Sequence, residues 1–562
     1  MNNDIALNDA ERGVAENVYA VDLPPPPTSA SEGPTRINSV ADLKKLPPPL
    51  HSSDEKPLAS EKKVETVVVT KEVSNAVKKP SPPKPKWKRA SRWVRFKLWY
   101  NTYRKFFTVV VTFNGIALLL AALNVWTYPR RYTGAFILGN LLTAILVRNE
   151  LFGRLLYLIV NTCFAKWPPL RLRLGCTSAL QHLGGIHSGC ATSGCAWLIF
   201  RVVLIFINHK NTHDAILITG VTTNLFIAVS ILSAFPWVRN THHKQDADMV
   251  PPFPAFSSAI IVLSAGLVFC RKSLFFFTPS STPSISCPIF LVKFDSNSHS
   301  FLSQCSTWVF VVLGDIYDPD TRKWDPNGTH MIRQQDFWFV FGMTVFILIP
   351  WFTVREVKVD IEIPSPKVAV LRFERGMQQG LLARISRSSV MEYHAFGIIS
   401  EGTHAKYHYL ICGVQGDFTR SLVNDPPSHI WTRQLKFAGV SNTSTLYKRG
   451  IRVCTGTGLG AALSTCIQSP NWYLIWIGSD QEKTFGPTIA GLIHRYVEPE
   501  RLCLWDSKQR GGRPDVMKLV RDAYHSWNAE VVFITSNYQG NQEIMEGCKS
   551  EGIPAFGTLW DF

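Results

Sequence analysis

Residues 451–466, "IRVCTGTGLGAALSTC", give the strongest indication of the fold expected for the C-terminal part of the chain. A short apolar run is followed by three glycines at alternate positions and then by small residues that suit the start of a helix. Glycine permits the tight turn and lets backbone N–H groups approach a pyrophosphate, which a helix N-terminus also attracts. The pattern favours a nucleotide-binding loop, with a packing turn as the alternative. Four residues are the expected contacts: Gly456, Thr457, Gly458 and Gly460.

The segments around this loop predict two domains. After it, the apolar runs "NWYLIWIGSD", "RLCLWDS" and "AEVVFITSN" alternate with helix-like stretches, which indicates a parallel α/β sheet with crossover helices. Before it, short alternating segments such as "KVAVLRF", "AFGIIS" and "YHYLICGV" indicate a small antiparallel β-barrel. We therefore expect a barrel over residues 356–449 and an NAD(P)-binding-like α/β domain over residues 450–562.

Two polar groups bear on which nucleotide is bound. Asp480 ends the strand after the glycine loop and suits a ribose hydroxyl. Ser507, Lys508 and Arg510 follow the next strand and suit a 2′-phosphate, because cationic donors pair well with phosphate oxygens. The alternative is that both groups are solvated loop residues. Between the two nucleotides, the sequence favours NADP(H).

The N-terminal half predicts an α-helical transmembrane bundle over residues 91–355. Residues 106–126 form a run of 21 residues without a charge, enough to cross a hydrocarbon layer about 30 Å thick. Residues 133–165 are apolar but interrupted by Arg148, Asn149 and Glu150, so they form either one long tilted helix or a span followed by an interfacial piece. Further candidate spans are residues 178–207, 215–238 and 337–352.

Basic residues predict the orientation of this bundle. Lysines and arginines cluster before the first span, around Lys166 and after the last span at Arg355, and such clusters face the cytoplasm. Six spans satisfy all three clusters and put both termini in the cytoplasm, with the plasma membrane as the expected location. The fifth span is the difficulty, because residues 244–304 change to serine, proline and phenylalanine. We expect an insertion there, either a part of the protein or an error of the gene model.

Charge and composition limit the partners. The net charge is +17, but the basic residues lie mostly beside apolar segments, which favours membrane lipid over nucleic acid as the partner. The twelve cysteines lack the spacing of a zinc module. Residues 1–90 are rich in proline, serine and lysine, which predicts a disordered cytoplasmic tail. Its proline runs suit either protein partners or a plain spacer.

Four histidines are candidates for haem ligation. His182 and His187 lie at the start of the third span, and His242 and His243 lie after the fourth. Two facing imidazoles can be axial ligands of one b-type haem, which makes His187 with His242 or His243 the expected metal ligands. The alternative is that these histidines face lipid headgroups. Glycines between His182 and Cys190 would admit either a flat ring or another helix.

A resemblance to known families rests on particular segments: "LQHLGGIHSGC", "LSAFPWVRNTHH", "CTGTGLGAALSTC", "PNWYLIWIGSDQEKTFG" and "IPAFGTLWDF". A helical membrane domain followed by a barrel and an α/β domain resembles ferric reductases and NADPH oxidases, whose C-terminal module is of the ferredoxin–NADP reductase type. The segments are more similar still to the fungal TmpA-type integral membrane proteins. They also resemble the membrane tails of fungal adenylate-forming, peptide-synthetase-like proteins.

The resemblance implies FAD as a second cofactor. His394 and Phe396 match the barrel motif that receives the flavin, although Gly397 stands where the reductases have a hydroxyl. Gly416 and Thr419 match the segment at the flavin pyrophosphate. Phe562 resembles the aromatic residue that stacks on the flavin, which makes it the implied catalytic residue. Where the reductases bring a cysteine near the nicotinamide, this chain has "TSN" at residues 535–537.

The implied function is electron transfer. An integral membrane oxidoreductase-like protein would move electrons from cytosolic NADPH through FAD, and through one haem, to an acceptor across the plasma membrane, with a role in fungal redox or developmental signalling. The sequence does not select the acceptor. The alternative is a catalytically inactive, reductase-like membrane sensor or scaffold, which the departures at Gly397 and Thr535 favour.

Overall fold

The structure is a computed structural model of the 562-residue chain, and it describes residues 90–208, 210, 212–233, 296–389 and 393–559. The tail expected to be disordered and most of residues 244–304 lie outside this part. His242, His243 and Phe562 lie outside it as well, so their assignments stay predictions.

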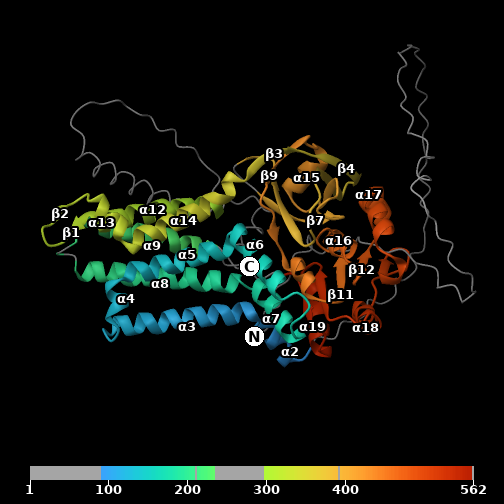
Figure 1. Cartoon of the computed structure of the whole chain (residues 1–562), viewed down its shortest axis with the longest axis horizontal. Coiled ribbons are helices and arrows are strands. Elements are labelled where there is room, and N and C mark those ends of the chain that lie inside the picture. The colour runs from blue at the N-terminus through green and yellow to red at the C-terminus, as the bar shows by residue number, and fades with distance from the viewer. Residues whose placement is uncertain (1–89, 209, 211, 234–295, 390–392, 560–562) are drawn as a thin grey trace, which may run out of the picture. The chain divides into compact units, whose positions relative to one another are not determined.

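The first part of the described chain is helical (Figure 1). Its helices are α2 (Arg92–Trp99), α3 (Thr102–Ala122), α4 (Thr127–Arg131), α5 (Thr133–Arg148), α6 (Glu150–Cys163), α7 (Leu170–Gln181), α8 (Gly184–Ile207), α9 (Asp214–Ser233), α12 (Ser296–Ile316), α13 (Gly328–Arg333) and α14 (Gln335–Phe352). A short hairpin of β1 (Tyr317–Asp318) and β2 (Lys323–Trp324) joins α12 to α13. Helix α8 packs on both α3 and α5, with Trp197 fully buried among them.

Four described helices, α3, α8, α9 and α14, are long and apolar enough to cross a membrane. Helices α5 and α6 form a fifth such unit only as a bent pair, with an angle of 70° between them. Asn149 makes the bend, because its Oδ1 accepts hydrogen bonds from the first N–H groups of α6 while its Nδ2 donates to the carbonyl of Phe346. Residues 133–165 were expected to form either one long tilted helix or a span followed by a separate piece. The structure has two helices, α5 and α6, in place of one long helix. The count of six spans stays a prediction, because the expected fifth span falls outside the described residues.

Helix α12 begins inside the segment expected to be an insertion. Residues 296–304 continue without a break into the helix that ends at Ile316. Gln304 is buried and donates hydrogen bonds to the carbonyl of Val340 and to the hydroxyl of Thr344, both on α14. The end of the segment is therefore part of the helix packing, whereas the origin of the rest stays a prediction.

The next part is an antiparallel sheet that curls on itself. Its strands are β3 (Val354–Lys358), β4 (Asp360–Ser365), β5 (Val368–Glu374), β6 (Leu381–Ser386), β7 (His394–Ser400), β8 (Tyr407–Gly413), β9 (His429–Arg433) and β10 (Phe437–Ala438). The order is β3-β9-β6-β7-β8-β5-β4, with β10 on β6. Strands β3 and β4 stand at opposite ends of this order although only Val359 separates them in sequence, so the two ends of the sheet must meet. The expected antiparallel barrel is thus present as a curled sheet.

The last part is a parallel sheet of β11 (Gly450–Thr455), β12 (Trp472–Gly478), β13 (Leu502–Asp506), β14 (Val531–Thr535) and β15 (Ala555–Phe556). Helices α16 (Leu459–Gln468), α17 (Gln481–Tyr496), α18 (Val516–Ser526) and α19 (Tyr538–Glu551) connect the strands. The strand order is β13-β12-β11-β14-β15, so β12 and β13 are added on one side of β11 and β14 and β15 on the other. Apolar cores lie on both faces, which explains the continuous apolar strands of the sequence.

Helices α6 and α7 fasten the helical part to the two sheets. Arg173 on α7 is 4% exposed and makes two hydrogen bonds to the carboxylate of Glu530, of 2.7 and 2.8 Å. The hydroxyl of Thr177 lies 2.7 Å from that of Tyr447. Glu150, at the start of α6, pairs with two arginines of the barrel, Arg384 and Arg433. A buried charge is costly without its partner, so these contacts fix where α6 and α7 lie.

We predict that Glu530→Gln lowers the free energy of unfolding by about 3 kcal/mol, the lower end for breaking a buried ion pair, because Arg173 would lose its counter-charge. Thermal unfolding of the detergent-purified chain measures this. The matched control is Asp360→Asn, which breaks an exposed pair with Arg372 and should cost much less, because solvent screens that pair. Equal effects of the two substitutions would contradict the prediction.

The same pair gives a pH dependence. Burial opposes ionisation of Glu530, but hydrogen bonds from Arg173 and from the Lys448 N–H outweigh it, so the pKa of Glu530 lies below its ordinary value of 4.5. The stabilisation is therefore present above that ordinary value and is lost as the pH falls through the lowered pKa. Glu530→Gln should remove this part of the acid sensitivity.

Candidate functional site

The candidate site lies at the carboxyl ends of β11 and β14. Between these two strands the order of strand addition switches from one side of β11 to the other. Open parallel sheets bind ligands at such a point. Residues Gly456–Gly458 form a 3-10 turn directly after β11, and α16 starts at Leu459. Gly456 has a φ of +52°, which favours glycine. No side chain caps the N-terminus of α16, so its first N–H groups suit an anion. The expected strand, glycine turn and helix are confirmed.

The loop after β14 closes one side of this turn. A Cβ atom on Gly458 would lie 2.4 Å from the carbonyl oxygen of Thr535, so no side chain fits between the two loops. The hydroxyls of Thr455 and Ser536 are 2.9 Å apart. Residues 535–537, which stand where the reductases have a cysteine near the nicotinamide, therefore contact the glycine turn directly.

The barrel closes the other side of the turn. A Cβ atom on Gly397 of β7 would lie 2.6 Å from both the Ala461 Cα and the Gly460 carbonyl oxygen. On β8, a Cβ atom on Gly413 would lie 2.7 Å from the Thr457 methyl group. The backbone of β7 thus lies directly on the first turn of α16. The segment expected to bind NADP(H) and the strand expected to bind FAD are brought together.

The expected flavin residues gather around Phe418, which lies on α15 (Asp417–Asn424). The ring of His394 stacks on that of Phe418 at 4.1 Å, and Phe396 lies at 6.4 Å. The Thr419 hydroxyl oxygen accepts hydrogen bonds from the N–H groups of Gln415 and Gly416. The turn at Gly416 is therefore held by the chain itself.

The fit to the two cofactors differs. The uncapped helix N-terminus and the glycine turn suit a pyrophosphate. The barrel strand offers His394 and Phe396, but the contact at Gly397 leaves no room for the hydroxyl-bearing side chain of the reductases. The protein therefore lacks one polar contact to a flavin that the resemblance would imply.

Asp480 and Lys508, expected as alternative determinants of the nucleotide, contact each other. The Asp480 carboxylate lies 3.1 Å from the Lys508 ammonium. Asp506 is fully buried at the end of β13 and accepts hydrogen bonds from the N–H groups of both residues. Arg510 lies over the Trp505 ring at 4.2 Å, and the Ser507 N–H donates to the Gly478 carbonyl. Both groups thus belong to one charged cluster. Asp506 was not predicted from the sequence, although an aspartate at the end of an apolar strand is a visible signal.

Each of the two candidate haem histidines in the described part of the chain contacts a backbone carbonyl group. His187 Nδ1 lies 2.9 Å from the carbonyl oxygen of Ala144, which can only accept, so the proton is on Nδ1 and Nε2 is the nitrogen able to ligate iron. His182 Nδ1 contacts the Ser178 carbonyl in the same way. Within the described residues no group of three or more histidine, cysteine or acidic side chains could hold a metal ion. Haem ligation by His187 stays a prediction.

The glycines near these histidines serve helix packing. A Cβ atom on Gly185 would lie 2.2 Å from the Tyr103 carbonyl oxygen, and one on Gly189 would lie 2.9 Å from the Val110 Cβ. Both neighbours belong to α3. Of the two alternatives, a flat ring or another helix, the described structure has the helix at these positions.

Comparison with known proteins finds a match that includes the glycine turn. Residues 440–562 match the sequence family described as the C-terminal domain of adenylate-forming reductase 03009. The chain is 26% identical over 474 residues to adenylate-forming reductase 06235 of Coprinopsis cinerea, and 25% identical over 477 residues to adenylate-forming reductase 03009 of the same fungus. Each alignment covers 82% of this chain and 40% of the relative. The chain thus spans about two fifths of the length of these curated relatives, and the expected likeness to adenylate-forming proteins is confirmed.

Two solved structures are similar to parts of this chain. A flavohemoglobin from Malassezia yamatoensis with bound FAD and heme has 13% identity and a TM-score of 0.31, covering 61% of this chain and 94% of that one. A ferredoxin–NADP+ reductase from Plasmodium falciparum in complex with 2′P-AMP has 10% identity and a TM-score of 0.28, covering 36% and 95%.

We predict that Gly397→Ala destabilises the protein by about 1–3 kcal/mol, because the added Cβ would press on the backbone of α16. Thermal unfolding of the detergent-purified chain measures the loss. Gly416→Ala is the matched control, since a Cβ there meets nothing within 4 Å. If Gly397→Ala were as stable as this control, the contact between β7 and α16 would not be as described.

We predict that Lys508→Ala weakens NADPH binding by about 10-fold to 100-fold and changes NADH binding much less, because a hydrogen bond to a charged group contributes about 1.5–3 kcal/mol and only NADPH carries the 2′-phosphate. Equilibrium titration of the purified chain with each nucleotide tests this. Lys518→Ala, an exposed lysine on α18, is the control. If NADPH and NADH binding were weakened equally, Lys508 would not be a contact of the 2′-phosphate.

Proposed function

We propose that this protein is an integral membrane oxidoreductase-like protein that moves electrons from cytosolic NADPH through FAD towards an acceptor across the plasma membrane. The observation that carries the proposal is the contact of the glycine turn with the barrel, through Gly397 on Gly460 and Ala461. This contact puts a nucleotide loop beside the strand that resembles a flavin strand. Electron transfer between two cofactors requires such proximity.

The residues have separate roles in this proposal. The turn at residues 456–460 and the first N–H groups of α16 bind the NADPH pyrophosphate. Lys508 and Arg510 would bind the 2′-phosphate, while Asp480 pairs with Lys508 and would accept a hydrogen bond from a ribose hydroxyl. His394, Phe396, Gly416 and Thr419 would hold the flavin, and Phe562 would stack on its ring. FAD, when bound, accepts a hydride and passes on single electrons.

The membrane part supplies the route across the bilayer. His187, with His242 or His243, ligates one haem, and the hydrogen bond from Nδ1 to Ala144 fixes the ring for ligation through Nε2. The four apolar helices support a membrane location. The plasma membrane, cytoplasmic termini, contacts with membrane lipid and protein partners for the proline-rich N-terminus belong to the proposal too. The fungal relatives and the resemblance to TmpA-type proteins support a role in fungal redox or developmental signalling.

A second candidate is a reductase-like membrane sensor or scaffold without turnover. Gly397 has no room for a hydroxyl side chain, and Thr535 stands where the reductases carry a cysteine near the nicotinamide. Both changes remove groups that normally contact the reacting rings. Such a protein would bind a nucleotide at the glycine turn and report it to the helices through α6 and α7.

We predict that the detergent-purified chain carries flavin, and that NADPH added without oxygen bleaches the flavin bands and then produces the sharp bands of reduced b-type haem. Absorbance spectroscopy measures both steps. His187→Ala should remove the haem bands and leave the flavin bands. A spectrum with neither cofactor would support the sensor instead.

A matched pair of variants tests the nucleotide loop in the same assay. Gly458→Ala should slow bleaching by NADPH at least about tenfold, equivalent to about 1.4 kcal/mol, because its Cβ would meet the Thr535 carbonyl at 2.4 Å. Gly491→Ala, on α17 with nothing within 4 Å, should leave the rate unchanged. Equal rates in the two variants would place NADPH elsewhere.

A further inference from the structure

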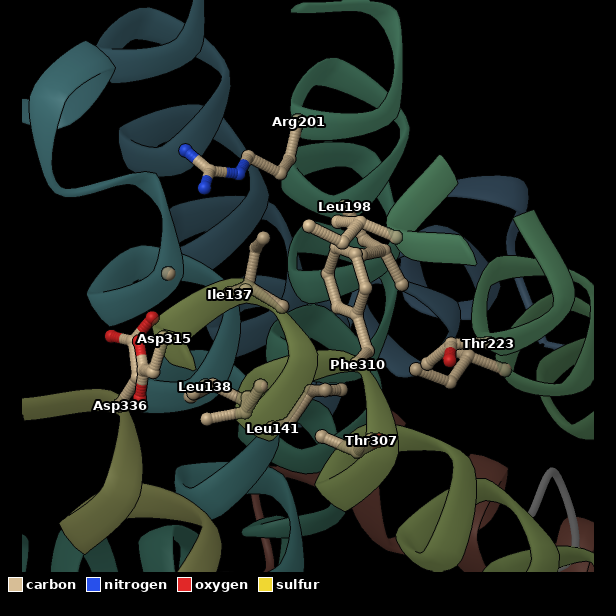
Figure 2. A pocket seen from close by; sticks show the side chains of 15 residues that line it. Ile137, Leu138, Leu141, Leu198, Arg201, Thr223, Thr307, Phe310, Asp315 and Asp336 are labelled. Carbon is tan, nitrogen blue, oxygen red and sulfur yellow. The ribbon is translucent and has the colours of Figure 1, made fainter. Parts of the chain in front are cut away.

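A cavity of about 60 Å³ lies inside the helical part, between α5, α8, α9, α12 and α14 (Figure 2). Most of its wall is apolar, with side chains such as Ile137, Leu138 and Phe310. Three ionisable side chains also line it: Arg201, Asp315 and Asp336. Ionisable groups among membrane helices are costly, so they indicate function more often than structure.

The carboxyl group of Asp315 has a polar atom without a hydrogen-bond partner in the cavity wall, within the part of the chain that the structure describes. Its Oδ2 is buried and has no hydrogen-bond partner among the described residues. Asp336 and Arg201 are both close enough to interact with it electrostatically, as is His330 of α13. A carboxylate oxygen without a partner in an apolar wall is costly unless a proton, a cation or water completes it.

Asp336 lies against the start of α5. A Cβ atom on Gly134 would be 1.8 Å from the Asp336 Oδ2, so the carboxylate occupies the space that a side chain at position 134 would need. Gly134 is in the first turn of α5, and a helix N-terminus attracts negative charge. The sequence thus makes room for a carboxylate from another helix at this point.

Thr223 supplies an independent observation on the far side of the cavity, away from the two carboxyl groups in Figure 2. Its side chain is 1% exposed, and its Oγ1 has no partner among the described residues. One water needs about 10–15 Å³ of such space, so the cavity has room for water. Polar atoms at both ends and this volume suit a hydrated ion better than an organic molecule.

We propose that this cavity is a hydrated binding site for one monovalent cation, held by Asp315 and Asp336. With all three ionisable side chains charged, one negative charge is left over, and a single positive charge neutralises it. A proton and an alkali-metal ion share this chemistry. Waters between the cation and Thr223 satisfy the hydroxyl. The groups that face Asp315 are Asp336 from α14, Arg201 from α8 and His330 from α13.

The site goes beyond the proposed electron transfer and does not depend on it. Helix α14 begins beside the cavity at Gln335 and ends at Phe352, just before the barrel. At 1.5 Å per residue, its 18 residues span about 27 Å. A loss of cation binding therefore does not require a loss of nucleotide binding, and the two can be measured separately.

The first experiment compares salts at constant ionic strength, using the full chain in detergent. Replacing choline chloride by sodium or potassium chloride should raise the melting temperature if the occupant is an alkali-metal ion. Asp315→Asn should abolish this rise, while Asp325→Asn, an exposed carboxyl in the loop between α12 and α13, should retain it. If neither salt acts, infrared titration in choline chloride should show a protonated carboxyl that Asp315→Asn removes, which identifies the proton as the cation.

Thr223→Val keeps every charge and covers the case in which Asp315→Asn fails to fold. In a hydrated site this substitution should weaken cation binding at least about tenfold, because the water contacts to the hydroxyl are lost. The melting-temperature or infrared titration would then need a cation concentration at least about tenfold higher. In a dry cavity, valine in place of an unpartnered hydroxyl should stabilise the protein and leave both signals unchanged. That result, or the absence of both a salt effect and a titrating Asp315, overturns the proposal.

Discussion

The contact of two backbones at Gly397 sets the arrangement of the candidate site. Because neither β7 nor the start of α16 carries a side chain between them, the barrel reaches the glycine turn directly. Ser464 then joins α16 to β7 by hydrogen bonds to the N–H and carbonyl groups of Ser400. The glycine turn and β7, the strand that resembles a flavin-binding strand, lie close together because Gly397 has no side chain. For the same reason β7 lacks the hydroxyl that the resemblance to the reductases would imply at this position.

Charged pairs carry the connection between the helices and the sheets. Glu150 and Arg173 lie on helices that follow the bend at Asn149, and both find their partners in the C-terminal part of the chain. Apolar side chains of these two helices, including Val160 and Leu174, also pack against the α/β core. A signal or a strain in the α/β domain would therefore reach α6 and α7 directly. Either proposed function needs such a connection.

Much of the fold was predictable because local patterns determined it. The alternation of strands and the glycine turn were predicted correctly from residue spacing, as at residues 451–466. Among the expected spans, residues 178–207 are divided between α7 and α8, so the apolar helix begins only at Gly184. The pairing of Asp480 with Lys508 was not predictable, because the two residues follow different strands and meet only in the folded sheet. Arg452 is fully buried and donates to Ser441 and to the Ala461 carbonyl, although its sequence position suggested only an apolar strand. The cavity at Asp315 depends on five helices and left no local signal.

The most direct measurement is a cryo-electron microscopy map of the full chain in lipid nanodiscs with FAD and NADP⁺ added. Electron transfer through the module predicts density for a pyrophosphate at the first turn of α16, beside residues 456–460, with flavin density against β7 near His394. Density for NADP⁺ at another site, or a map in which β7 and α16 touch with neither cofactor present, would contradict the assignment of this loop and strand to electron transfer.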